Sequence, residues 1–118
     1  MASTKTAKTL GASASLAAAT SRDETEWNMS TAYGGLVTVK LTNGASAPTT
    51  APTVTVYVGE STGTKRKFYT ATGDTTNNSV THIVCEIPPS AMFVNVNILN
   101  GATNAITVES YGQELTTT

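Results

Sequence analysis

Apolar and polar residues alternate along most of the chain beyond residue 30, the pattern of half-buried β-strands. In the first clear example, Val37, Val39 and Leu41 would face one side of a sheet and the residues between them the other side. Asn43-Gly44 follows directly and is a strong turn signal. The same alternation, ended by glycine, proline or Asn-Gly, predicts six strands near residues 37–42, 54–58, 66–72, 80–87, 92–99 and 106–111.

Short strands with turn signals between them are typical of all-β folds. Residues 27–31 add a candidate short strand, and Phe68 is the expected apolar anchor of the strand at residues 66–72. Residues 45–53 and 73–79 are expected to be loops. Weak helical periodicity occurs only at residues 12–19, where Ser and Thr dilute it. We therefore predict a single antiparallel β-sandwich or small jelly roll.

The first 22 residues have a different composition from the rest of the chain. They contain Lys5, Lys8 and Arg22, no acidic residue, and many Ala, Ser and Thr. Serines interrupt the apolar stretch at residues 10–19, so it matches a signal peptide poorly. We interpret residues 1–22 as a retained, extended N-terminal arm and residues 23–118 as the β-sandwich domain.

The composition excludes several classes of protein. The 118 residues carry a net charge of -1, only 13% are charged, and 24 are threonine. Nucleic acid is not an expected partner, because there is no basic excess. A membrane is not expected either, because no apolar run reaches the length of a membrane helix. Neutral, threonine-rich strands with few edge lysines are prone to pair with other chains, which favours an assembly role.

No combination of residues suggests catalysis, a metal site or a cofactor. Cys85 is the single cysteine and His82 the single histidine, and their odd separation on one strand places them on opposite faces. Cys85 is expected in the core and His82 at the surface. The acidic run at residues 23–26 lacks the ligand spacing of a calcium loop, so a solvated segment is favoured over a cation site. We expect a protein that is not an enzyme, with no cofactor and no metal.

One basic run, Lys65-Arg66-Lys67, precedes two aromatic residues. A solvated hairpin end explains this run, and a patch that pairs with an acidic protein surface explains it better than nucleic-acid binding does. The candidate partner-binding residues combine this run with residues of the arm: Lys5, Lys8, Leu10, Leu16, Lys65, Arg66 and Lys67.

Binding of a glycan is a further alternative. Such sites need exposed aromatic rings beside polar groups. The candidates are Trp27, Tyr33, Tyr57, Tyr69 and Tyr111, each of which could equally belong to the core or to an interface. A glycan-binding module would gather several of them around one groove.

Three parts of the sequence resemble small virion proteins of tailed bacteriophages. They are residues 31–44, TAYGGLVTVKLTNG, residues 106–116, ITVESYGQELT, and the Lys/Thr/Ala/Ser-rich opening at residues 1–19; Glu86-Ile-Pro-Pro89 is similar too. The resemblance implies a β-sandwich subunit of a phage particle without enzymatic activity. It includes no site motif, so it assigns no functional residue.

These observations together predict a structural protein of the virion, assembled in the host cytoplasm. The expected role is a capsid decoration or cement protein, a homo-oligomer that binds the major capsid protein or other virion proteins. Many copies would attach through strand edges and through residues 1–21 as a linking arm, and multivalency would make them hard to remove. The alternatives are a tail or baseplate component and a host-surface or glycan-binding module.

Overall fold

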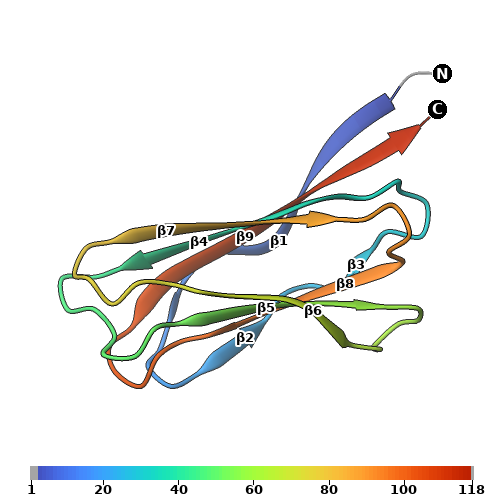
Figure 1. Cartoon of the computed structure of the whole chain (residues 1–118). Coiled ribbons are helices and arrows are strands. Elements are labelled where there is room, and N and C mark those ends of the chain that lie inside the picture. Colours follow the sequence, from blue (N-terminus) through green and yellow to red (C-terminus); the bar gives the residue numbers. More distant parts are fainter. Residues whose placement is uncertain (1–2, 118) are drawn as a thin grey trace.

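The computed structural model describes residues 3–117, which form nine β-strands (Figure 1). The strands are β1 (Ser3–Leu16), β2 (Ser21–Asp23), β3 (Trp27–Asn28), β4 (Gly35–Asn43), β5 (Thr53–Gly59), β6 (Arg66–Thr72), β7 (Val80–Ile87), β8 (Phe93–Leu99) and β9 (Ile106–Thr117).

The strands form two antiparallel sheets that pack face to face. One sheet has the order β1-β9-β4-β7, and the other has the order β2-β8-β5-β6, with β3 also paired to β8. When β2 and β3 are taken as one interrupted strand, this order is that of an eight-stranded jelly roll. The prediction of an all-β sandwich or jelly roll is confirmed.

The core lies between the two sheets and is built by the predicted alternation. Its centre consists of buried aliphatic side chains from β4, β5, β8 and β9: Val37, Val39, Leu41, Val54, Val56, Val94, Val96, Ile98, Ile106 and Val108. Ile83, Cys85 and Ile87 add the inner face of β7. β-branched residues dominate because they pack well on a pleated surface.

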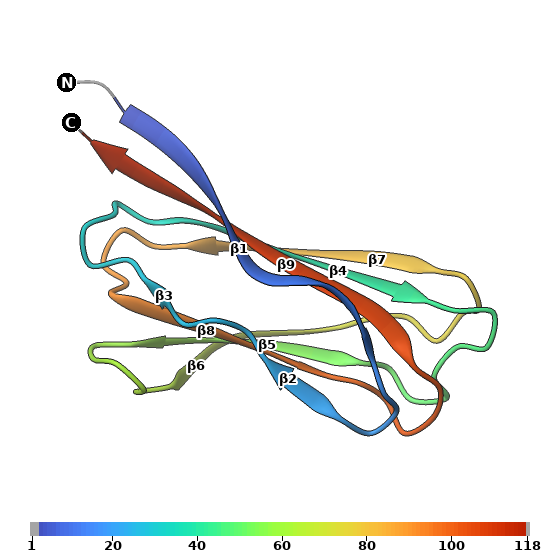
Figure 2. The same ribbon diagram turned by 180° about the vertical axis from the view of Figure 1, so that it is seen from behind.

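The two long sides of the sandwich differ. On the side seen in Figure 2, β1 is linked to the opposite sheet, because Thr25 N donates a hydrogen bond to the Leu10 carbonyl (3.0 Å). Arg22 Nη1 also donates to the Ala12 carbonyl (3.0 Å). The opposite side carries the edge strands β7 and β6, which face the viewer in Figure 1.

A partly buried ion pair lies on the β1 side, and its acidic partner belongs to the segment predicted to be solvated. Arg22 donates from Nε and Nη2 to the two carboxylate oxygens of Glu24 (2.6 and 2.9 Å), and Ser110 Oγ donates to Glu24 Oε2. The Glu24 side chain has no exposed surface. Gly11 leaves the space for this pair, since a Cβ there would overlap the Glu24 carboxylate. The prediction of a solvated acidic segment is therefore wrong for Glu24.

The structure places residues 1–22 differently from the interpretation as a separate arm. Strand β1 pairs with β9 from Ser3 to Leu16, and the side chains of Leu10 and Leu16 lie in the core. Residues 1 and 2 lie outside the described part of the chain. Residues 12–16, where weak helical periodicity was noted, are also part of β1. Most of this segment is thus an edge strand of the sandwich.

Two other expectations differ from the structure. Phe68, the expected anchor of β6, is exposed because it lies at a register irregularity opposite Val56 and Tyr57. Strand β9 continues through Gly112, where the sequence predicted its end. In residues 3–117 no helix has the length and apolar character needed to cross a membrane.

Candidate functional site

Strands β1 and β9 continue as a two-stranded ribbon beyond the end of the sandwich (Figure 1). The last pairing of β4 joins Gly35 to Glu114, whereas β1 pairs with β9 as far as Ser3 and Thr117. Residues 3–5 and 115–117 form this extension, which we call the terminal ribbon. It contributes to the 49 Å long axis of the molecule, compared with 26 and 18 Å across.

The terminal ribbon is anchored at its base by Trp27. The indole is buried and packs under Gly112 of β9, where a Cβ would lie only 2.7 Å from the ring. Trp27 Nε1 donates to Glu114 Oε2 (3.3 Å), and Lys8 Nζ lies 3.5 Å from Glu114 Oε1. The absence of a side chain at Gly112 therefore explains why β9 can continue over the indole into the ribbon.

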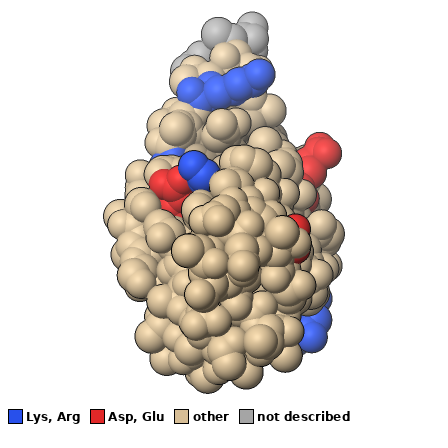
Figure 3. Space-filling model, turned by 90° about the vertical axis from the view of Figure 1, so that its left-hand side faces the viewer, with Lys and Arg blue, Asp and Glu red and all other residues tan. Residues whose placement is uncertain are grey.

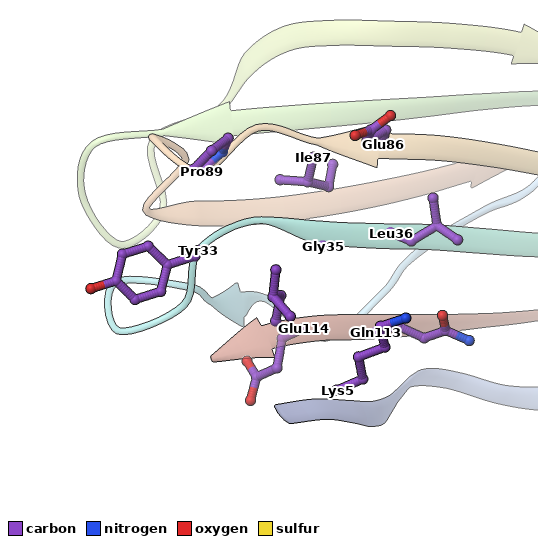
Figure 4. Close-up of a pocket in the computed structure, with 10 residues that line it drawn as sticks. Lys5, Tyr33, Gly35, Leu36, Glu86, Ile87, Pro89, Gln113 and Glu114 are labelled. Carbon is purple, nitrogen blue, oxygen red and sulfur yellow. The ribbon is translucent and has the colours of Figure 1, made fainter. Parts of the chain in front are cut away.

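A hollow of about 370 Å³ lies at the base of the terminal ribbon. Figure 4 shows Lys5 from β1, Gln113 and Glu114 from β9, Leu36 from β4 and Glu86 from β7 around it. Its full lining is Lys5, Tyr33, Gly35, Leu36, Glu86, Ile87, Pro89, Gln113, Glu114 and Leu115. The three charged side chains of both signs and the aliphatic side chains of this lining suit a protein side chain better than a small charged ligand.

Of the predicted partner-binding residues, Lys5 alone lines this hollow. Sequence reasoning missed Leu36 and Gln113, although the alternation along residues 36–41 already placed Leu36 opposite the core-facing valines. Tyr33 was a candidate for glycan binding only, and alternation could not place it in this hollow, because it lies in the turn before β4 and not in a strand.

The other predicted partner-binding residues are divided between two distant edges and the core. Leu10 and Leu16 are buried, and Lys8 pairs with Glu114. In the turn before β6, Lys65 Nζ lies 3.8 Å from Asp23 Oδ1 of β2, and Arg66 at the start of β6 binds Glu60 through Nε (3.0 Å) and Nη2. Lys67 is exposed on β6. The seven residues do not form one surface, because Leu10 and Leu16 lie in the core and the lysines of β1 lie on the opposite long side of the sandwich from β6.

The turn at residues 60–65 folds over the outer face of the β2-β8-β5-β6 sheet. Gly63 N donates to Glu26 Oε2 (2.9 Å), and Asn95 Nδ2 donates to the same oxygen (3.1 Å). These two hydrogen bonds lower the pKa of Glu26. The Arg66 guanidinium lowers the pKa of Glu60 to about 2. The acids and bases of this region therefore neutralise one another, which supports the interpretation of a hairpin end.

A second hollow, of about 410 Å³, lies on the outer face of the β1-β9-β4-β7 sheet. Lys40 lies between His82 of β7 and Glu109 of β9, and its Nζ is 3.8 Å from Glu109 Oε1. Tyr111 Oη donates to Glu109 Oε2 (2.8 Å), and this hydrogen bond raises the pKa of Tyr111. The arrangement provides one exposed aromatic ring beside several polar groups.

The aromatic candidates do not gather around one groove. Trp27 is core, Tyr33 lines the hollow beside the ribbon, and Tyr111 lines the hollow on the outer face. Tyr69 lies on β6, and Tyr57 on β5 is half-buried. A glycan site built from several of these rings is therefore not assembled in this structure.

The residues considered for catalysis and metal binding are arranged as follows. Cys85 is buried and His82 is exposed, so their placement on opposite faces is confirmed. Burial raises the pKa of the Cys85 thiol, which makes it less reactive. Over residues 3–117, no three His, Cys, Asp or Glu side chains lie together as a metal site would require.

The end of the molecule opposite the ribbon is formed by neutral loops, and few charged side chains are visible there in Figure 3. Within the loops at residues 17–20, 44–52, 73–79 and 100–105, Asp74 is the one charged residue. Its carboxylate accepts hydrogen bonds from Thr76 N (2.8 Å) and Ser79 Oγ (3.0 Å), which lower its pKa. Buried Asn43 and Asn100 tie the loops together through backbone carbonyls.

Comparisons with known proteins identify the fold of the chain. No family model matches it, and no curated protein matches it. Among solved structures, it is similar to a chain in the structure of infectious bursal disease virus, Gx strain, with 12% identity, a TM-score of 0.63, and coverage of 97% of this chain and 32% of that one. A chain of T=1 particles derived from the same virus gives 13% identity, a TM-score of 0.53, and coverage of 96% and 31%.

A third similar structure is the K3 cleaved adhesin domain of Lys-gingipain from Porphyromonas gingivalis W83. It gives 12% identity, a TM-score of 0.52, and coverage of 79% of this chain and 62% of that one. The chain thus spans about a third of the viral chains and less than two thirds of the adhesin domain. At such low identity these similarities establish the fold: the chain is a β-sandwich similar to viral and adhesin domains.

Proposed function

We propose that this chain is a non-enzymatic structural protein of a bacteriophage virion, a decoration or cement protein that attaches to the capsid shell. The observation that carries the proposal is the terminal ribbon, a pair of strands that projects from the sandwich beyond the end of β4. On the β9 side the backbone of Leu115 already binds Gly34 and Tyr33. The edge offered to a neighbouring protein is therefore that of β1 at residues 3–5, and the hollow at the base of the ribbon can receive a side chain of that protein.

Three further observations support this role. The sequence resembles small virion proteins of tailed phages, the fold is similar to that of a chain in a virus structure, and the loop end is nearly uncharged. The proposed partner is the major capsid protein or another virion protein. Many copies on one shell would give firm attachment even where each contact is modest.

The first test is quantitative mass spectrometry of purified phage particles. We expect a copy number within a few-fold of that of the major shell protein. A handful of copies per particle would favour a tail or baseplate component instead. Absence from the particles would contradict both virion roles.

The second test asks whether the ribbon is the attachment element. Shells that lack this protein are incubated with the purified chain, with a variant that lacks residues 1–5, or with Lys5→Gln. Lys67→Gln on β6 is the matched control, because it removes one exposed positive charge far from the ribbon. We expect the truncation to abolish attachment, Lys5→Gln to weaken it and the control to attach normally. Normal attachment of the truncated chain would refute this role of the ribbon.

A glycan-binding module remains the second candidate, favoured by the hollow beside Tyr111. Replacing Trp27 cannot test it, because that side chain belongs to the core. Tyr111→Ala is suitable, since Tyr111 is exposed and its loss would remove the ring that stacks on a sugar. If the chain is absent from particles but binds a glycan, and Tyr111→Ala does not, this candidate replaces the virion role.

A further inference from the structure

We propose that the edge strand β7 pairs antiparallel with β7 of a second copy of this chain, which joins the four-stranded sheets of the two copies into one continuous sheet. The inference concerns the isolated chain and does not depend on the virion role. It rests on the unpaired backbone groups of β7, on the contrast with the other sheet edges, and on the self-complementary order of its side chains.

The unpaired backbone groups of β7 follow from its hydrogen bonds to β4. Asn43 N donates to the Ser79 carbonyl (2.9 Å), so this pair and every second pair beyond it exchange hydrogen bonds. On the other side of β4, Leu115 N donates to the Gly34 carbonyl (3.0 Å), as the same alternation requires. The backbone N–H and C=O groups that point away from β4 therefore belong to Val80, His82, Val84 and Glu86.

The other sheet edges are less suited to pairing. Strands β2 and β3 span only three and two residues, and β6 combines a register irregularity with Arg66 and Lys67. Strand β1 has two irregularities, and its Leu10 and Ala12 carbonyls accept hydrogen bonds from Thr25 and Arg22. These features block the addition of a strand.

Strand β7 lacks such protection. Its eight residues pair with β4 without a register shift, and they include no proline, lysine or arginine. Val80 and Val84 are 46% and 55% exposed, high values for β-branched residues in a strand. A regular, nearly neutral edge with exposed valines is the kind of edge that adds a further strand.

The side chains are complementary to those of a second β7. With a two-fold axis at Ile83, Val80 faces Glu86 of the second copy and His82 faces its Val84. The backbone N–H and C=O groups of all four residues that point away from β4 then form hydrogen bonds with the second copy. Glu86, the one acidic residue of β7, faces a valine and no like charge. A shift by two residues would leave outward groups unpaired. This self-complementarity favours a second copy over an unrelated strand.

The first test is sedimentation equilibrium of the purified full chain, and we expect a dimer. Val84→Lys should weaken the dimer about tenfold or more, because each copy loses a cross-strand valine contact and gains a charge at the new interface. The matched control is Thr107→Lys, which adds the same charge to an exposed position on β9, away from the edge. A monomer at all concentrations, or equal effects of the two variants, would overturn the proposal.

Disulfide trapping tests the register. His82→Cys and Val84→Cys are made separately in a Cys85→Ala chain, whose fold is checked by circular dichroism. A hydrogen-bonded antiparallel pair has a Cα–Cα distance of about 5.5 Å, which a disulfide can bridge. We expect rapid cross-linking only when the two variants are mixed. Cross-linking of either variant alone would overturn the register, and no cross-link in the mixture would overturn the pairing.

Discussion

Glu24 is the residue on which the β1 side of the sandwich depends. Its carboxylate binds both the Arg22 guanidinium and the Ser110 hydroxyl, and its backbone N–H donates to the Val96 carbonyl (2.9 Å). It thus connects β9 in one sheet to β8 in the other. Such an ion pair adds little to the free energy of unfolding when it is compared with well-packed apolar residues in its place. Removal of one partner alone lowers that free energy, because the other charge is left without its counter-ion.

Glu24→Gln should therefore lower the free energy of unfolding by about 1–2 kcal/mol, because Arg22 keeps its charge, loses its anion and is only in part exposed to water. Urea denaturation followed by tryptophan fluorescence measures this, since Trp27 is buried in the folded state. Glu60→Gln is the control: both partners of the Glu60–Arg66 pair are well exposed, and we expect a much smaller shift of the midpoint. Equal shifts for the two variants would contradict the importance of the buried pair.

Gly11→Ala tests the same pair from the opposite strand. The new Cβ would overlap the Glu24 carboxylate, so we expect a loss of about 1–3 kcal/mol in unfolding free energy. Gly44→Ala is matched to it, because no atom lies within 4 Å of a Cβ at that position and its φ is not positive. That variant should be neutral or slightly more stable. An unchanged unfolding free energy in Gly11→Ala would show that the Arg22–Glu24 pair can move at little cost.

At the scale of elements, β1 has two parts with different roles. Leu10 and Leu16 anchor its body in the core, whereas residues 3–5 extend beyond β4. Removal of residues 1–5 should leave the thermal midpoint nearly unchanged. Removal of residues 1–16 should prevent cooperative folding, because it deletes two core leucines and exposes the edge of β9. Circular dichroism melts of the two truncated chains check this, and a cooperative transition in the shorter chain would contradict it.

The strands that sequence reasoning predicted well are those with apolar residues on one face only. Val37, Val39 and Leu41 show this alternation, and so do Ile83, Cys85 and Ile87. Strand β1 was not recognised because its core contacts come from two leucines six residues apart, with register irregularities between them. Its threonines and alanines do not distinguish an edge strand from an extended arm.

The hollow beside the ribbon was harder to predict, for a physical reason. Its lining comes from four strands and two turns, and it forms only where β9 leaves β4 over the Trp27 ring. In the sequence, the glycine at position 112 indicates the end of a strand, because glycine has no side chain to contribute to a sheet. Here the missing side chain is what allows the strand to pass over an indole.

At the scale of the whole molecule, several carboxylates have lowered pKa values in the folded state. Glu26, Glu60 and Asp74 are each stabilised as anions by hydrogen bonds, and the pKa of Glu60 falls to about 2. The unfolded chain binds protons more readily at these groups, so they contribute stability above their ordinary pKa values near 4, and this stability is lost as the pH falls towards the folded values. The opposite holds for Tyr111, whose raised pKa contributes stability below pH 10 that is lost at higher pH.

The thermal midpoint should therefore be nearly constant between about pH 5 and 8 and decline between about pH 4.5 and 2. It should decline again above about pH 8.5, first through the buried Cys85 thiol and then through Tyr111, because the folded state raises the pKa of both groups. Glu60→Gln should make the acid decline less steep, and Tyr111→Phe should do the same for the alkaline one, because each removes one of the groups whose pKa differs between the two states. Calorimetric scans at pH 2, 3, 5, 7, 9 and 10.5 measure both limbs. An acid limb equally steep in Glu60→Gln would mean that the other carboxylates with lowered pKa values, Glu26 and Asp74, control the loss of stability. Since the Glu60–Arg66 pair holds the turn that covers the β8 and β5 face, the comparison also separates opening of that turn from unfolding of the sandwich.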